Sequence, residues 1–401
     1  MHILLIHQAF TALDEAGGTR HHELARFLVS RGHKVTIIAS PVSYLTGKII
    51  ETGDQNHEEG ITILRAYTYS ALHRSFVDRV ISFMSFMFSS FVLGLRVRNV
   101  DLVWGTSPPI FQGVTSLLLA RLKGIPFLFE VRDLWPAFAI AVGVLSNPIL
   151  INSSLWLERF LYKNADRVMV NSPGYIEHVT QRGAKNVKLI PNGADPDMFT
   201  PQANGISFRK RLGVKGEFIV LYAGAHGLSN DLGVVLQAAE QLQVHTDIRF
   251  VFIGDGKDKP ALQARAKAMD LSNVLFSPAA SKAEMADVMA AADACVAILL
   301  PIELYKTTYP NKVFDYMAAG RPVILAIDGV IRQVVDSAGA GIFVPPGNPT
   351  AMAEAVLTLS SDKLKARSMG MAGRQYIEQF FSRHDLAEKL NLLLEEMREN
   401  G

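Results

Sequence analysis

The sequence predicts an α/β protein of two Rossmann-like domains, each a doubly wound parallel sheet, that face a central cleft. Short apolar runs alternate with amphipathic segments in two separate blocks, and buried parallel strands have this continuous apolar pattern. A chain of 401 residues is too long for one ordinary hydrophobic core. Between the blocks lies LIPNGADPDMFTPQANG, whose Pro, Asn, Asp and Gly are typical of a linker. We therefore expect a first domain over 1–195 and a second over 196–375.

The first block begins with HILLIH, which predicts a strand, and with TRHHELARFLVSRGH, which predicts a helix ending at Gly32. Four more apolar runs predict strands of this domain: KVTIIAS, LVWGTS, PFLFEVRD and DRVMVNS. The second block predicts a helix through DLGVVLQAAEQL and strands at EFIVLYAGA, IRFVFIG, NVLFSP, ACVAILL and PVILAI. Ligands of such sheets bind at the carboxyl ends of the strands, so the loops that follow the strands are expected to hold the site.

Composition narrows the class of protein. Apolar residues make up 49% and charged residues 19%, which is typical of a folded globular chain. Residues 1–195 hold 19 Lys and Arg against 15 Asp and Glu, and the remainder holds 21 against 23. This mild basic excess of the first half suits an anionic surface or ligand and is too weak to indicate nucleic acid. The single cysteine, Cys295, excludes an intramolecular disulfide, and MHILLIHQAF lacks the features of a secretory signal, so we expect a cytoplasmic protein.

Two loops of the first block carry candidate residues. Gly17 and Gly18 allow backbone to approach a ligand before a helix starts near Thr19, and Arg20 is expected to project from its first turn toward an anion; a plain glycine turn with a solvated arginine is the alternative. No GxGxxG is present, which disfavours a nicotinamide or flavin cofactor. In FEVRDLWP, Glu130, Arg132 and Asp133 end a buried strand, where charges are costly unless paired or used. Pairing of Arg132 with either carboxylate is the structural alternative, and Asp133 is the residue for which we favour a functional role.

Two loops of the second block complete the candidate set. In YAGAHG, Gly224 and Gly227 permit a tight turn facing a phosphate, and His226 is a candidate for the cleft or an ordinary loop residue. The similar FIGDGKDK predicts a simple turn. In YPNKVFDYMAAGRPV, Tyr309, Pro310 and Asn311 precede or start a helix.

The first turn of this helix has the chemistry of a nucleotide site. The N–H groups of Lys312, Val313 and Phe314 and the charge of Lys312 suit an anion. Asp315, one turn on, can accept hydrogen bonds from a ribose diol. A capped, solvated helix end is the alternative.

Taken in order, GGTRHHELA, EVRDLWP, LYKNADRVMVNSPGY, LIPNGADPDMF, YAGAHG and YPNKVFDYMAAGRPV resemble retaining glycosyltransferase family 4, which has the GT-B fold. Within it the chain most resembles the WbuB-like branch of bacterial O-antigen, lipopolysaccharide and capsule assembly, such as N-acetyl-L-fucosamine transferases. The resemblance implies that the second domain binds a nucleoside diphosphate sugar, that the first binds the acceptor, and that helices over 376–401 cross back to the first domain.

The chain departs from the family pattern in three places. The two glutamates of the family, separated by seven residues, match Thr307 and Asp315, and Glu303 is a nearby substitute for the first. An Arg and a Lys that grip the diphosphate in many members are absent from AHGLSND. Neutralising the phosphates then falls to Lys312, Arg20 and helix N–H groups. The family's HD pair matches Arg132 and Asp133.

These residues imply a reaction without a metal or other cofactor. Negative charge grows on the leaving diphosphate as the anomeric C–O bond breaks, so fixed cations and N–H dipoles there lower the barrier. The family implies retention of anomeric configuration, with a UDP-sugar such as UDP-N-acetylhexosamine or UDP-N-acetyl-L-fucosamine as donor. Asp133 would orient the acceptor hydroxyl or stabilise the developing charge of the sugar.

One segment bears on the acceptor. FVDRVISFMSFMFSSFVLGLRVR is uncharged over the 16 residues from 80 to 95, fewer than the roughly 20 that span a bilayer. Its apolar residues between flanking arginines fit a helix at a membrane surface, with Phe83, Met87 and Phe91 along one stripe. A buried core helix is the alternative. The membrane interpretation predicts an enzyme at the cytoplasmic face of the inner membrane with a polyprenyl-diphosphate-linked saccharide as acceptor.

Two other functions remain open from the sequence. One is a GT-B nucleotide-sugar epimerase or hydrolase that needs no acceptor, and the other is a non-catalytic subunit that binds a nucleotide sugar. The arginine-flanked apolar segment disfavours both, because neither needs a lipid surface.

Overall fold

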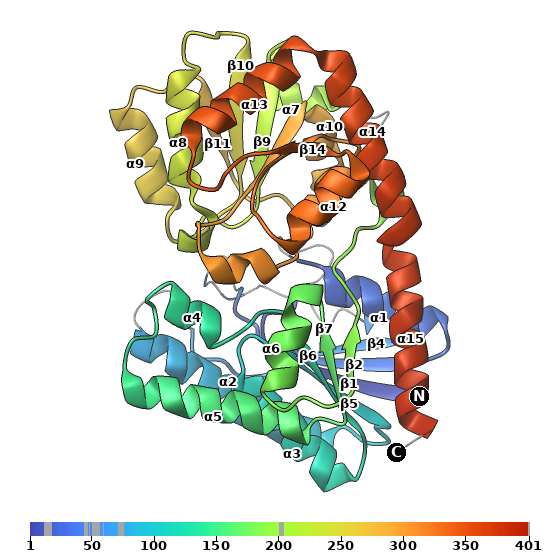
Figure 1. Cartoon of the computed structure of the whole chain (residues 1–401). Helices are drawn as coiled ribbons and strands as arrows, with labels where there is room; N and C mark the ends of the chain where they lie inside the picture. The colour runs from blue at the N-terminus through green and yellow to red at the C-terminus, as the bar shows by residue number, and fades with distance from the viewer. Residues whose placement is uncertain are drawn as a thin grey trace. The chain divides into compact units, whose positions relative to one another are not determined.

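The computed structural model describes residues 1–11, 18–43, 47, 49, 57–58, 60–70, 76–199 and 204–399. The chain forms two compact units. Among the described residues, the first unit holds 1–11, 18–191 and 384–399, and the second holds 192–383. Each unit is a sheet with helices on both faces (Figure 1). The prediction of two parallel-sheet domains of Rossmann type is therefore confirmed.

The sheet of the first unit has the strand order β3-β4-β2-β1-β5-β6-β7-β8. All neighbours are parallel except β3, which runs antiparallel to β4 at the edge. The bounds are β1 (His2–Ile6), β2 (Lys34–Ala39), β3 (His57–Glu58), β4 (Ile61–Arg65), β5 (Leu102–Ser107), β6 (Phe127–Val131), β7 (Arg167–Val170) and β8 (Val187–Leu189). The central strands β1, β5 and β6 are buried throughout, as continuous apolar runs predict.

The strand order reverses at β1, so the right-handed crossovers place helices on opposite faces of this sheet. The helices are α1 (Arg20–Ser30), α2 (Phe76–Arg96), α3 (Phe111–Lys123), α4 (Ala137–Ala141), α5 (Pro148–Asn164), α6 (Ile176–Gln181) and α15 (Arg383–Glu399), with a 3₁₀ turn η1 (Pro173–Tyr175). The crossovers through α2, α3 and α5 place these three helices on one face, and α1 lies on the other.

The last helix packs beside the first one (Figure 1). Leu386, Leu390 and Leu394 of α15 share a core with Leu24 and Leu28 of α1. Polar contacts fix the register of this helix pair, for His33 Nε2 lies 2.7 Å from Asn391 Oδ1 and Arg31 forms a 2.6 Å ion pair with Glu388. The sequence assigned all of 376–401 to the crossing segment, whereas the structure keeps residues up to 383 in the second unit.

The second unit has an all-parallel sheet in the order β11-β10-β9-β12-β13-β14. Its strands are β9 (Phe218–Ala223), β10 (Ile248–Ile253), β11 (Val274–Ser277), β12 (Ala294–Ile298), β13 (Val323–Ala326) and β14 (Gly341–Phe343). Its helices are α7 (Ile206–Arg211), α8 (Leu232–Gln241), α9 (Lys259–Ala268), α10 (Lys282–Ala291), α11 (Asn311–Ala318), α12 (Val330–Ala338), α13 (Pro349–Ser361) and α14 (Lys363–Phe380), with 3₁₀ turns η2 (Pro196–Met198), η3 (Leu228–Asn230) and η4 (Glu303–Thr307). One core cluster lies under α10, α11 and α12, and another lies under α8 and α13 on the opposite face.

Helix α2 buries a face on which three of the four buried residues are small. Ser82, Phe86, Ser90 and Gly94 are buried, and a Cβ at Gly94 would stand 2.3 Å from Leu119 Cδ1. The helix therefore approaches α3 closely. Among the described helices, residues 77–96 alone have the length and mean hydropathy (1.4) to cross a membrane, and 22% of their apolar window is buried.

The sequence placed Phe83, Met87 and Phe91 along one stripe of α2, which faces either lipid or the protein core. All three side chains are half-buried, and the Phe83 ring lies 6.2 Å from that of Phe111. This stripe is therefore neither fully exposed nor fully buried. The exposed apolar stripe runs instead through Val77, Ile81, Phe88, Val92 and Leu95.

Candidate active-site residues in the two domains

Helix α11 begins where the sequence predicts, with Pro310 as N-cap and Asn311 as its first residue. The peptide before it is anchored, because the Tyr309 carbonyl accepts a 2.8 Å hydrogen bond from Asn192 Nδ2 and the Tyr309 ring packs on Phe314. The N–H of Val313 donates to the Pro310 carbonyl at 3.2 Å. Val313 thus does not supply the free N–H group that the sequence predicted.

Lys312 occupies a desolvated position at this helix start. Its Nζ donates to Tyr222 Oη at 2.7 Å and to Asn230 Oδ1 at 3.3 Å, and it lies 4.0 Å from the centre of the Tyr222 ring. In the part of the chain that the structure describes, no ion pair involves Lys312. Burial lowers its pKa to about 7. The Tyr222 hydroxyl donates a hydrogen bond to the Ala225 carbonyl at 2.8 Å, so the phenol oxygen presents a lone pair to the ammonium and no full negative charge.

Tyr316 fixes α11 against the end of β9. Its buried hydroxyl accepts a hydrogen bond from Ala223 N–H at 3.0 Å and lies 3.2 Å from the Ala223 carbonyl. This contact sets the next residue, Gly224, against Lys312. Gly224 has φ +146°, and a Cβ there would stand 3.0 Å from Lys312 Nζ. A glycine is required here both by conformation and by the approach of the ammonium.

The other glycine of this loop has no such requirement. Gly227 has φ −131°, and a Cβ there would meet nothing within 4 Å. In the neighbouring loop, a Cβ at Gly254 would stand 1.8 Å from the Gly224 carbonyl oxygen, and one at Gly256 would stand 2.4 Å from that of His226. These two glycines let the two loops pack together, which is more than the simple turn that the sequence predicted.

His226 lies inside an aromatic cluster. Its side chain is fully buried, its ring stacks 5.8 Å from Tyr222, and the rings of Phe252 and Phe276 lie 6.3 Å away. Burial lowers its pKa to about 4, so the imidazole is neutral at pH 7. Neither ring nitrogen has a hydrogen-bond partner among the described residues.

Three other residues of the second unit were named from the sequence, namely Asp315, Thr307 and Glu303. Asp315 Oδ2 accepts a hydrogen bond from Asn311 Nδ2 at 3.2 Å, across one turn of α11. Thr307 Oγ1 donates to the Leu304 carbonyl at 2.6 Å. Glu303, the nearby carboxylate, is 83% exposed and pairs with Lys306 at 2.8 Å.

In the first unit, Arg20 stands on the first turn of α1, where the sequence placed it. It is buried, with one guanidinium nitrogen 3.2 Å from Glu130 Oε1 and another donating to the Ile190 carbonyl at 2.9 Å. Glu130 Oε2 also contacts His21 Nε2 at 2.7 Å and accepts from Trp104 Nε1 at 3.1 Å. Burial raises the pKa of Glu130, but His21 and Arg20 more than reverse this and bring it to about 2. Arg20 thus neutralises a buried carboxylate at the end of β6.

Asp133 lies two residues beyond β6 and is partly buried. Burial raises the pKa of Asp133 to about 7, although the nearby positive charge of Arg132 acts to lower it. Arg132 itself contacts His7 Nε2 at 3.1 Å, and Thr106 Oγ1 lies 3.2 Å from His7 Nδ1. Glu130 is held by Arg20 and His21, and the charge of Arg132 lowers the pKa of both Glu130 and Asp133.

Gly18 has open space around its Cα, and Thr19 is the N-cap of α1. The Thr19 hydroxyl donates to Glu23 Oε1 at 2.5 Å instead of capping the helix. Gly17 lies outside the described residues.

Sequence analysis missed several residues of these two regions. His7 directly follows the first strand, so the rule that selected Glu130 would also have found it. Tyr222 and Trp104 had no such signal because they stand within apolar strand runs. Asn230 had none because it lies in a polar loop.

Comparison with known proteins agrees with this architecture. Residues 16–193 match a glycosyl transferase 4-like domain, and residues 217–362 match the glycosyl transferases of group 1. WcaI of Escherichia coli K12, named for a glycosyl transferase role in colanic acid biosynthesis, is 24% identical over 347 residues, which cover 82% of this chain and 85% of WcaI.

Two solved structures share the fold along the whole chain. Sucrose-phosphate synthase from Thermosynechococcus elongatus superposes with a TM-score of 0.81 at 19% identity and covers 100% of both chains. Anabaena HepE in complex with UDP-glucose superposes with a TM-score of 0.75 at 16% identity and covers 99% of this chain and 100% of HepE. The two matched domains, in this order and on this fold, identify the chain as a GT-B glycosyltransferase with a family 4-like first domain and a group 1 second domain.

Proposed function

We propose that the enzyme transfers a sugar from a UDP-sugar to a lipid-linked saccharide during assembly of a bacterial surface polysaccharide. The observation that carries the proposal is Lys312. A buried ammonium at a helix start, whose hydrogen-bond partners among the described residues are a phenol and an amide, suits an anion such as a diphosphate. HepE, which shares the fold, binds UDP-glucose, and WcaI is named for polysaccharide synthesis.

The proposed roles follow from the geometry of each unit. Lys312 and the start of α11 neutralise the charge that grows on the leaving diphosphate. Asp315, held by Asn311, accepts the ribose hydroxyls. In the first unit, Asp133 orients the acceptor hydroxyl or stabilises the developing positive charge of the sugar. Arg20 is not assigned to the phosphates, because Glu130 already holds it.

The finer features of the proposal come from the family resemblance. They are retention of anomeric configuration, independence of metal, a donor of the UDP-N-acetylhexosamine or UDP-N-acetyl-L-fucosamine type as in the WbuB-like branch, and peripheral location on the cytoplasmic face of the inner membrane.

The test uses labelled UDP-sugars with and without membrane lipid extract. UDP release that depends on the extract supports transfer. Release or isomerisation without extract indicates an epimerase or hydrolase, and binding without turnover indicates a non-catalytic subunit. Chelator should leave the rate unchanged, and a rate abolished by chelator and restored by magnesium would contradict metal independence.

A further inference from the structure

Exposed apolar side chains gather on three helices of the first unit. Of the 23 exposed large apolar side chains in the described part of the chain, eleven lie on α2, α3 and α5. They are Val77, Ile81, Phe88, Val92 and Leu95 on α2, Leu118 and Leu122 on α3, and Ile149, Leu150, Trp156 and Phe160 on α5. Single exposed apolar residues are ordinary, but such a concentration marks an interaction surface.

These three helices form one layer, in which α3 packs against both others. Thr115 Oγ1 of α3 donates to the Met87 carbonyl of α2 at 2.8 Å. On its other side, a Cβ at Gly113 of α3 would stand 2.8 Å from Leu161 Cδ1 of α5. The inner faces of the helices are buried against the sheet and one another, so their exposed residues adjoin on the outer side of the layer. We call the outer side of α2, α3 and α5 the outer helical face.

The exposed residues follow helical spacing. On α2, residues 77, 81, 88, 92 and 95 recur at intervals of three, four and seven, so they share one side of the helix. On α5, Trp156 and Phe160 are one turn apart, and their rings stack at 5.3 Å with an interplanar angle of 13°. Trp156 is 63% exposed and Phe88 is 62% exposed. Two aromatic anchors thus stand on separate helices of the face.

The charges on these helices are almost all basic. Their basic residues are Arg79, Arg96, Arg121, Lys123, Arg159 and Lys163, and their acidic residues are Asp78 and Glu158. Glu158 is fully buried and already pairs with Arg182 at 2.9 Å and with His178 at 2.8 Å. Of the basic residues, Arg96, Arg121, Arg159 and Lys163 are exposed, and we call these four residues the basic border of the outer helical face.

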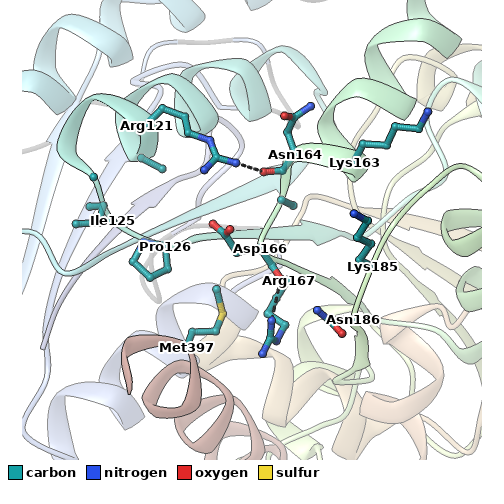
Figure 2. A pocket seen from close by; sticks show the side chains of 13 residues that line it. Arg121, Ile125, Pro126, Lys163, Asn164, Asp166, Arg167, Lys185, Asn186 and Met397 are labelled. Atoms are coloured by element: carbon teal, nitrogen blue, oxygen red, sulfur yellow. Dashed lines mark hydrogen bonds between the residues drawn. The ribbon is translucent and has the colours of Figure 1, made fainter. Parts of the chain in front are cut away.

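A basic hollow adjoins the C-terminal ends of α3 and α5 (Figure 2). It has a volume of about 610 Å³, and its charged lining is Arg121, Lys163, Arg167, Lys185 and Asp166. The carboxylate accepts a hydrogen bond from Phe127 N–H at 2.8 Å. Arg167 already pairs with Glu396 at 3.0 Å. The remaining cations, Arg121, Lys163 and Lys185, face one occupied carboxylate, and this excess favours anionic groups at this border.

We propose that the outer helical face docks on the surface of an anionic phospholipid bilayer, with the basic border and hollow against the head groups. Aromatic and aliphatic side chains on amphipathic helices enter the interfacial region, while Lys and Arg meet anionic head groups. The charge pattern favours a lipid surface over a second copy of the chain, because two copies would bring the same basic borders together. The inference rests on the proposed lipid-linked acceptor and specifies the surface that reaches it.

The test is sedimentation of the full chain with vesicles of phosphatidylglycerol and phosphatidylcholine. Because the changed side chains are exposed, melting temperatures should stay at the wild-type value. Phe88→Ser with Trp156→Ser should weaken vesicle binding roughly tenfold or more. The control is Val244→Ser with Leu364→Ser, at still more exposed apolar positions of the second unit (83% and 79%), which should leave binding unchanged.

Charge is tested in the same assay. Arg159→Glu with Lys163→Glu should weaken binding roughly tenfold, and the effect should shrink in high salt or with phosphatidylcholine alone. Lys363→Glu with Lys365→Glu, on α14, is the control that should change nothing.

Four outcomes would overturn the proposal: wild-type protein that does not bind vesicles, full binding by either test variant, equal losses in the controls, or a Phe88 and Trp156 variant whose only change is from dimer to monomer in sedimentation equilibrium. Transfer to a short water-soluble acceptor separates this proposal from the proposed function. Transfer without vesicle binding rejects the surface alone, and vesicle binding without transfer rejects the function alone.

Discussion

The Lys312 ammonium donates a 2.7 Å hydrogen bond to the Tyr222 hydroxyl at the start of α11 and lies 4.0 Å from the centre of that ring. A phenol is a weak partner for a buried cation, and burial lowers the pKa of Lys312 to about 7. A donor diphosphate would offer the Lys312 ammonium a full negative charge in place of the neutral phenol. Under the proposed function, Lys312 would therefore gain more from the bound diphosphate than from its present partners.

Lys312→Met should reduce transfer by about two to three orders of magnitude, since it removes charge stabilisation at the leaving group. The melting temperature should not fall, because the substitution removes a desolvated ammonium and Tyr222 keeps its hydrogen bond to Ala225. Lys312→Arg controls for charge alone and should recover only part of the rate, because the larger group meets Gly224. A Met variant with wild-type turnover would exclude Lys312 from the reaction.

Asp315→Asn keeps the shape of the side chain but removes a charge-assisted acceptor, which costs roughly 1–3 kcal/mol. UDP affinity measured by calorimetry should fall about ten- to hundredfold. Unchanged affinity would leave Asp315 with a structural role in α11, such as its hydrogen bond with Asn311 and its place near the helix dipole.

Gly224→Ala and Gly227→Ala form a matched pair in one loop. The Cβ at position 224 would stand 3.0 Å from Lys312 Nζ, on a backbone with φ +146°, so UDP affinity and turnover should fall at least tenfold. The Cβ at 227 meets open space with φ −131°, so both quantities should stay within about twofold of wild type. Equal effects at the two positions would contradict the close approach of Lys312 to Gly224.

Arg20→Met should act on stability, because it leaves Glu130 buried without its guanidinium partner. We expect a loss of about 3–5 kcal/mol in the free energy of unfolding. Glu130→Gln in the same chain should restore much of that loss, since no carboxylate then needs compensation. The UDP affinity of the folded fraction should be unchanged. A stable Arg20→Met protein with weakened UDP binding would return Arg20 to the phosphate site.

The sequence predicts the middle of each sheet better than its edges. Strands β1, β5, β9 and β12 are buried throughout, so their apolar runs are continuous. The sequence predictions lack β3, β4, β8 and β14, which lie at or near the sheet edges. The side chains of β4, β8 and β14 are partly exposed. Edge strands bury less, so their pattern is weak.

The candidate site shows a similar division. Gly224 and Lys312 each stand at the end of a strand or the start of a helix, and this local rule selects them. Their partner Tyr222 lies inside the apolar run of β9, where an aromatic residue is expected to belong to the core. The pairing of Arg20 with Glu130 joins segments 110 positions apart in the sequence. No local pattern predicts that contact, so the sequence assigned Arg20 to an anion without identifying its carboxylate partner.

The central claim is that Lys312 binds the donor diphosphate. Calorimetry tests this claim by measuring the number of protons taken up when the nucleotide sugar binds. With a pKa near 7, Lys312 is about half neutral at pH 7, and a bound diphosphate favours its protonated form. UDP-N-acetylglucosamine has no phosphate that titrates near pH 7, so its binding should take up about half a proton at pH 7, measured in buffers of different ionisation enthalpy. Above pH 7 the neutral form dominates, so affinity should weaken by up to tenfold per pH unit. Lys312→Met should abolish the uptake. Binding of the wild-type protein with no proton uptake, or uptake that persists in Lys312→Met, would contradict the account.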